Sequence, residues 1–202
     1  MNGRTIQRLL VALSLVLACA TQADAQWRYG FRAGVMRTRT TSPDTWDCND
    51  KWGSAIGAVV KYDFTDWVAL QGELNYALRG FKTDLFTTAD FKPYDWLFNF
   101  HYVNVPVLGK FYPAALPFFI EAGPQLGFLA GYGENVKGTD APAAFSRSDW
   151  HTFDAAAVFG LGIETEMGLF FDLRYNLGLT KTAAAPRHFR HRGIEITAGY
   201  LF

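Results

Sequence analysis

The chain has 202 residues, with 19 basic and 19 acidic side chains and no net charge, and 16% of its residues are aromatic. Because it lacks a basic excess, the composition excludes a protein that binds nucleic acid mainly through charge. The length suits one domain.

The first 25 residues predict a secretory signal peptide. Two arginines precede a short apolar run at residues 9–20, and Ala23-Asp24-Ala25 forms a cleavage site before Gln26. The run is shorter than the roughly 20 residues that a membrane-spanning helix needs. Residues 16–18, in front of Cys19, resemble a lipobox, so processing as a lipoprotein is the alternative.

The mature domain is expected to span residues 26–202. It keeps 17 basic and 18 acidic residues, because Arg4, Arg8 and Asp24 leave with the signal. If Cys19 leaves too, Cys48 is the only thiol, and no internal disulfide is possible. The exported domain must therefore fold without a disulfide.

Eight segments of the mature chain alternate apolar and polar residues with a period of two, which predicts strands with two different faces. In residues 169–180, for example, Leu173 and Tyr175 share one face while Asp172 and Arg174 share the other. In chain order the segments are about 27–36, 54–64, 68–79, 96–110, 118–130, 152–164, 169–180 and 193–202.

The connections between these segments alternate in length. The short ones are residues 65–66, 113–117 and 166–168, and the long polar ones are about 37–53, 80–95, 131–150 and 181–192. This alternation indicates an all-β, eight-stranded antiparallel up-and-down transmembrane barrel with short periplasmic turns, long extracellular loops and both termini in the periplasm. Pro106 and Pro124 lie inside predicted strands and predict local bulges, because proline cannot donate to the ladder.

The main alternative is a soluble ligand-binding barrel in the periplasm, in which the apolar face would fill the interior. Eight strands leave room inside only for side chains, and the polar face here is rich in glycine, which suits a narrow lumen. Tryptophans near the predicted strand ends also fit the aromatic girdles of membrane barrels. They are Trp27, Trp52, Trp67, Trp96 and Trp150.

Several short motifs resemble the porin-family outer-membrane β-barrel proteins, the PorT-like group of Bacteroidota-type bacteria. They are V-N-V-P-V-L-G-K at 103–110, F-I-E-A-G-P-Q-L-G at 119–127, G-L-G-I-E at 160–164, D-L-R-Y-N-L-G-L at 172–179 and the final G-Y-L-F. The resemblance implies an OmpA-like barrel in the outer membrane and brings no catalytic residues. By analogy it leaves open an accessory role in a secretion or transport system.

The polar face predicts a lumen that contains thirteen charged side chains. Such charges in a narrow tube must pair, since unpaired buried charges are costly. A plugged lumen is expected, and a gated ion or proton path is the alternative. The residues are Arg28, Arg32, Lys61, Asp63, Glu73, Arg79, Lys110, Glu121, Asp154, Glu164, Asp172, Arg174 and Glu195.

A basic stretch precedes the last strand, and a solvated loop is expected there. The alternative is contact with lipopolysaccharide phosphates, which suit arginine in charge and geometry. The candidate residues are Arg187, Arg190 and Arg192. His188 and His191 lie between them, and their cationic neighbours disfavour a metal. We expect no metal and no other cofactor.

A lipid-modifying enzyme of the outer membrane is a further alternative. Such an enzyme would need a nucleophile beside a histidine base. His151 lies near Ser146 and Ser148 in the sequence, and His101 lies near another strand end. Such a neighbourhood arises easily by chance, so a protein without enzymatic activity is expected.

The last strand ends in Tyr200 and Phe202, which predict the signal that barrel-assembly machinery engages. It must also pair with the first strand, because a bilayer does not tolerate an open sheet edge. The sequence therefore predicts a non-enzymatic outer-membrane barrel that serves envelope structure or presents its loops to an unknown partner.

Overall fold

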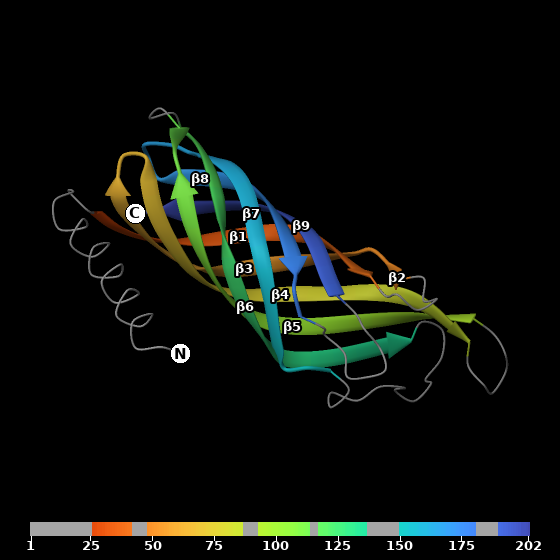
Figure 1. Cartoon of the computed structure of the whole chain (residues 1–202). Coiled ribbons are helices and arrows are strands. Elements are labelled where there is room, and N and C mark those ends of the chain that lie inside the picture. Colours follow the sequence, from red (N-terminus) through yellow and green to blue (C-terminus); the bar gives the residue numbers. More distant parts are fainter. Residues whose placement is uncertain (1–25, 42–47, 87–92, 114–116, 137–149, 181–189) are drawn as a thin grey trace, which may run out of the picture.

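A computed structural model describes residues 26–41, 48–86, 93–113, 117–136, 150–180 and 190–202. These residues form nine strands (Figure 1). The strands are β1 (Gln26–Thr41), β2 (Cys48–Asn49), β3 (Lys51–Thr65), β4 (Val68–Phe86), β5 (Pro93–Phe111), β6 (Phe118–Val136), β7 (Phe153–Glu164), β8 (Leu169–Gly178) and β9 (Arg190–Leu201). The described part of the chain contains no helix long and apolar enough to span a membrane.

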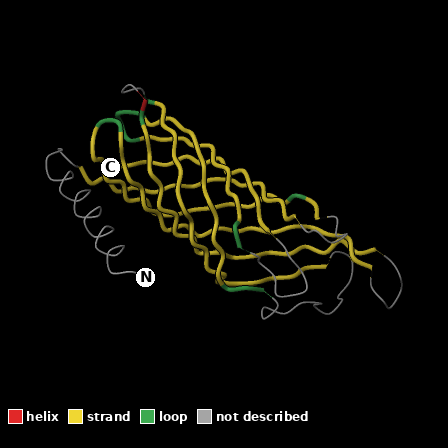
Figure 2. The backbone as a smooth tube through the Cα atoms, in the orientation of Figure 1, coloured by secondary structure: helices red, strands yellow, loops and turns green. Residues whose placement is uncertain are grey.

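The eight long strands form a closed antiparallel barrel. Each pairs with the long strand before it and after it in the chain, and β1 closes the circle by pairing with β9. Figure 2 shows the strands inclined to the barrel axis, as closure of a sheet requires. The predicted eight-stranded antiparallel barrel is thus confirmed. The two-residue β2 pairs with β4 at its far end.

The two ends of the barrel differ. The described connections 66–67 and 165–168, the connection after β5 and both described chain ends lie at one end, which we call the turn side. The opposite ends of the long strands, such as the last residues of β4 and β6, lie at the other end of the barrel, the loop side. At the turn between β7 and β8, Gly168 has a φ of 87° and accepts a hydrogen bond from the Leu201 backbone (2.8 Å). A side chain there would meet the Leu201 carbonyl, so glycine is required.

Several strands extend further on the loop side than the sequence predicted. β4, β5 and β6 have 19 residues each, and much of the segment predicted as the second long loop pairs as the outer part of the β4–β5 hairpin. β4 and β5 project beyond the barrel in Figure 1. The segment was predicted as a loop because it is polar. An antiparallel strand with one face in solvent can also be polar, and its backbone groups are still hydrogen-bonded to the neighbouring strand.

The two proline-based predictions of bulges were wrong. The register between neighbouring strands is the same before and after Pro106 and Pro124, although the ladder between β5 and its neighbours is interrupted near them. The irregularities lie instead between His101 and Tyr102 in the pairing with β6 and near the end of β3. The strands therefore accommodate both prolines without an inserted residue.

Candidate functional site

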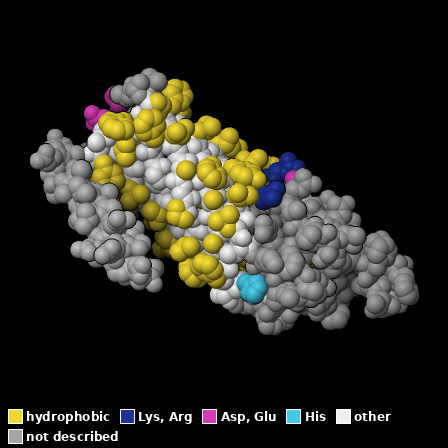
Figure 3. Space-filling model, in the orientation of Figure 1, with side chains coloured by type: hydrophobic (Ala, Val, Ile, Leu, Met, Phe, Trp, Pro, Cys, Tyr) yellow, Lys and Arg dark blue, Asp and Glu magenta, His cyan; other side chains and the backbone are white. Residues whose placement is uncertain are grey.

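The strand alternation divides the barrel into an apolar outer face and a polar lumen. On β8, Asp172, Arg174 and Asn176 are buried, whereas Leu173 and Tyr175 between them are exposed. Hydrophobic side chains cover much of the outer face, and the charged groups visible there lie towards its ends (Figure 3). The candidate site is therefore the lumen.

The lumen contains the charges that the sequence predicted on its polar face. Arg28 and Asp63 are partly exposed near the turn side, with side-chain exposures of 27% and 21%. The other eleven are buried: Arg32, Lys61, Glu73, Arg79, Lys110, Glu121, Asp154, Glu164, Asp172, Arg174 and Glu195. Each of the eight long strands contributes at least one of the thirteen.

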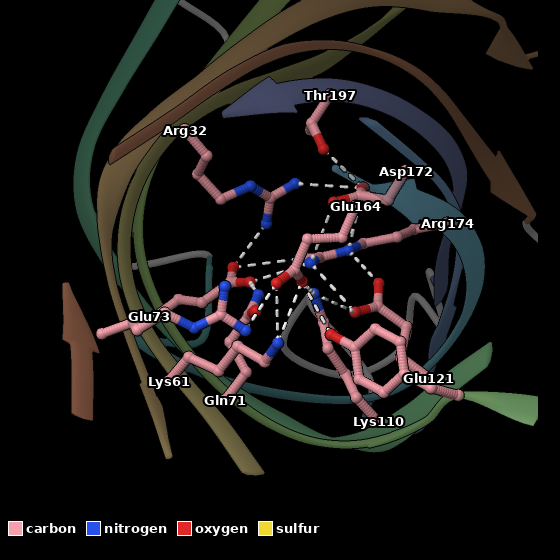
Figure 4. A network of polar contacts seen from close by, with 12 residues as sticks. Arg32, Lys61, Gln71, Glu73, Lys110, Glu121, Glu164, Asp172, Arg174 and Thr197 are labelled. Carbon is pink, nitrogen blue, oxygen red and sulfur yellow. Dashed lines mark hydrogen bonds and ion pairs between the residues drawn. The ribbon is translucent and has the colours of Figure 1, made fainter. Parts of the chain in front are cut away.

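Two arginines and four carboxylates form a central cluster (Figure 4). Arg174 contacts Glu73 at 2.8 Å, Glu121 at 2.5 Å and Asp172 at 3.1 Å. Arg32 pairs with Glu73 and, at 2.8 Å, with Glu195. Since both guanidinium groups contact Glu73, they bridge opposite walls of the lumen through one carboxylate.

The carboxylates of the central cluster also accept hydrogen bonds from neutral side chains. Glu73 accepts from Gln71 at 2.6 Å and from Asn75 at 2.7 Å, and the Thr197 hydroxyl donates to Asp172. These donors lie on the same strand face as the charges, so the alternation could have identified them. They satisfy oxygen atoms that the arginines leave open.

A second cluster lies nearer the turn side around Glu164. Its carboxylate contacts Lys61 at 2.8 Å and Arg28 at 2.7 Å and accepts a hydrogen bond from the Tyr112 hydroxyl at 2.7 Å. Asp63 pairs with the same two cations, at 3.0 Å from Lys61 and 2.9 Å from Arg28. Tyr112 lies just beyond β5, outside every predicted strand, which is why sequence reasoning missed it.

Lys110 connects the two clusters. Its ammonium nitrogen lies 3.8 Å from Glu121 of the central cluster and 3.9 Å from Glu164. It also lies 3.8 Å from the centre of the Phe119 ring, a distance typical of a cation–π contact. Together the ion pairs form a continuous network through the turn-side half of the lumen.

Among the described residues, the loop-side half of the lumen contains the ion pair of Arg79 with Asp154 and a group of aromatic rings. Arg79 lies 3.4 Å from Asp154, which accepts a hydrogen bond from Thr180 at 2.6 Å. Beyond this pair, the rings of Phe100 and Trp150 pack with their centres 4.7 Å apart. Phe98, Tyr102 and Tyr132 join them.

This aromatic group corrects the prediction for Trp150. We expected Trp150 in a girdle on the outer face, but its side chain is 7% exposed and packs inside. Trp27, Trp52 and Trp67 do lie exposed on the outer face near the strand ends. The Trp96 side chain lies outside the described residues. Trp150 lay in a predicted connection, where alternation assigns no face, and residues 96–100 are aromatic on both parities.

The remaining candidates do not converge on one site. The Tyr76 hydroxyl and His101 Nδ1 lie 2.5 Å apart on the outer side of the barrel, and His151 is exposed. Ser146, Ser148 and His188 lie outside the described residues. Among the residues that the structure does describe, no group of three His, Cys, Asp or Glu side chains could hold a metal ion.

The predicted lipid-contact and assembly residues are placed in part. Arg192 is exposed on the outer face of β9, Arg187 lies outside the described residues, and Arg190 is placed only by its backbone, which pairs with Thr41. Tyr200 and Phe202 are exposed at the turn-side end of β9.

A comparison with known families decides the class of this barrel. Residues 20–184 match the family described as "Outer membrane protein beta-barrel domain". The chain belongs to this family. It is therefore an eight-stranded barrel protein of the outer membrane, and its apolar outer face excludes the soluble barrel that the sequence left open. No curated protein matches the sequence.

Solved structures share the fold of this outer membrane barrel. Neisserial surface protein A is 14% identical, with a TM-score of 0.52, over 86% of this chain and 95% of its own. The attachment invasion locus protein Ail of Yersinia pestis, solved in complex with the heparin analogue sucrose octasulfate, is 14% identical, with a TM-score of 0.50, over 88% of this chain and 99% of its own. At this identity the likeness is one of fold.

Proposed function

We propose that the protein is a non-enzymatic, non-conducting barrel of the outer membrane that serves envelope structure or presents its loop-side segments to a partner. In this proposal the turn side, with both chain ends, faces the periplasm. Short turns on one side and long connections on the other support that orientation, since this is the arrangement of bacterial outer-membrane barrels.

The ion-pair network carries the proposal of a closed lumen. The central and turn-side clusters cross the lumen and are joined through Lys110, and their buried charges come from all eight long strands. An eight-stranded barrel has an interior only wide enough for side chains. An ion that crossed it would have to separate buried pairs, which costs several kcal/mol in each case.

Conductance of the purified, refolded protein in planar bilayers tests this closure. We expect negligible steady current from the natural sequence. A double variant, Arg32→Ala with Arg174→Ala, removes the two guanidinium groups that bridge the lumen and should raise the current if it folds. Folding is checked for each sample by heat-modifiable gel mobility. Large stable channels from the natural protein would refute the closed lumen.

A lipid-modifying enzyme is the second candidate, and the Tyr76–His101 contact is the observation that favours testing it. The two groups lie on the outer side of the barrel, where lipid would be accessible. We expect no deacylase or phospholipase activity from the purified protein. Activity that is lost in His101→Ala or His151→Ala would show that the non-enzymatic assignment is wrong.

An accessory role in secretion rests on the resemblance of the sequence motifs to PorT-like proteins and stays a prediction. Its test is a comparison of the proteins secreted by the producing bacterium with and without this chain. A selective loss of secreted proteins, restored by the natural sequence, would favour the accessory role over a purely structural one.

A further inference from the structure

Two exposed arginines mark the loop-side edge of the apolar outer face where β1 and β9 meet. On β1 the exposed residue after Val35 is Arg37, and on β9 the exposed residue before Ile194 is Arg192. The outer face thus changes from aliphatic to basic within two residues on both strands. In a membrane barrel such a change is expected where hydrocarbon gives way to lipid headgroups.

The strand register brings these arginines close together. Arg37 is opposite Ile194, and Arg192 is two residues further along β9, so the two arginines are diagonal neighbours. Such neighbours are about 7–8 Å apart, which long side chains can span. The register also places a third arginine, Arg39, directly across the ladder from Arg192. Figure 3 shows a small group of basic side chains, with an acidic one beside it, where the hydrophobic surface ends on the loop side.

The described part of the chain supplies little negative charge to balance this edge. Arg37 pairs with Asp50 at 2.8 Å, but its side chain remains 57% exposed. For Arg192 the described residues provide no ion pair. Like charges on neighbouring strands repel each other, so an external anion would stabilise the seam.

We propose that Arg37 and Arg192 bind the phosphate of an anionic glycolipid of the outer leaflet at the β1–β9 seam. Guanidinium groups present several donors in a planar fork that matches phosphate oxygens, and Trp52, exposed on β3 opposite Arg37, lies beside the site. The inference rests on the proposed orientation, in which the loop side faces the outer leaflet. Asp50 acts as an internal competitor for Arg37.

Binding of phosphorylated lipid A to the detergent-refolded protein tests the site, with dephosphorylated lipid A and inorganic phosphate as comparison ligands. The variants are Arg37→Gln, Arg192→Gln, the double variant, and Asp50→Asn. Each arginine variant should weaken binding about tenfold, since hydrogen bonds to charged groups are strong. Asp50→Asn should tighten binding about two- to fivefold, because it frees Arg37.

The matched control is Arg187→Gln with Arg190→Gln, which removes the same charge as the seam double variant. We expect it to weaken binding less than the seam variant does. Unchanged affinity in the folded seam variant, or a loss confined to the control, would overturn the proposal. Equal affinity for inorganic phosphate and lipid A would overturn the assignment to a lipid. Conductance measured on the same samples separates failure of the closed lumen from failure of this site.

Discussion

Tyr29 and Phe202 exchange two backbone hydrogen bonds across the seam of the barrel. The Phe202 nitrogen donates to the Tyr29 oxygen at 2.8 Å, and the Tyr29 nitrogen donates to the Phe202 oxygen at 3.3 Å. The last residue of the chain thus pairs directly with the first strand. Without this pairing, the turn-side end of the seam would expose backbone donors and acceptors to the bilayer.

Deleting Phe202 should reduce the folded fraction. Both hydrogen bonds are lost, at about 0.5–1.5 kcal/mol each. The chain would then end at Leu201, which is itself part of β9. Heat-modifiable gel mobility after refolding into lipid vesicles measures the effect. Phe202→Tyr is the control, because it keeps the backbone and an aromatic end. Equal folded fractions for the deletion and the natural chain would contradict this role of the seam.

Replacing Arg174 with Met should destabilise the barrel by about 3–5 kcal/mol, because Glu73, Glu121 and Asp172 lose their shared cation inside the lumen. Urea unfolding in vesicles measures the change. Replacing the exposed Glu166 with Gln is the control and should change stability by less than about 0.5 kcal/mol. Similar unfolding midpoints for both variants would mean that the central cluster contributes little.

Gly199→Ala should destabilise the protein by about 1–3 kcal/mol through overpacking. A Cβ at this position would lie 2.2 Å from the buried Phe170 ring and 2.6 Å from the Phe31 carbonyl oxygen. Gly72→Ala is a matched control in another strand, because no heavy atom lies within 4 Å of its added Cβ. The same unfolding experiment should separate the two variants, and a Gly72→Ala loss as large as that of Gly199→Ala would refute the packing argument.

Tyr112→Phe should cost about 1.5–3 kcal/mol, because the Tyr112 hydroxyl donates to the Glu164 carboxylate inside the lumen. Tyr29→Phe is the control, since Tyr29 is exposed on the outer face. Unfolding midpoints of both variants provide the measurement. If the control lost as much stability as Tyr112→Phe, the buried hydrogen bond would not explain the loss.

The sequence by itself determined the number of long barrel strands and, for most of them, which face is polar. The period of two needs no tertiary information, because successive side chains on any strand point to opposite sides. The alternation therefore assigned Glu73 and Arg174 to the polar faces of their strands, which line the lumen. The same alternation was uninformative at residues 96–100, where both parities are aromatic, and it did not apply to Trp150, which lay in a predicted connection, so the inward placement of this aromatic group was missed.

Only the tertiary structure decided how far the strands extend and which charges meet. Arg174 pairs with Glu73, 101 residues away in the sequence, because the tilt and register of a closed barrel bring β8 and β4 side chains to the same height in the lumen. The outer part of the β4–β5 hairpin forms because its two strands satisfy each other's backbone, whatever their polarity. Alternation assigns each residue to a face, but contacts across the lumen depend on closure, which no single segment of sequence encodes.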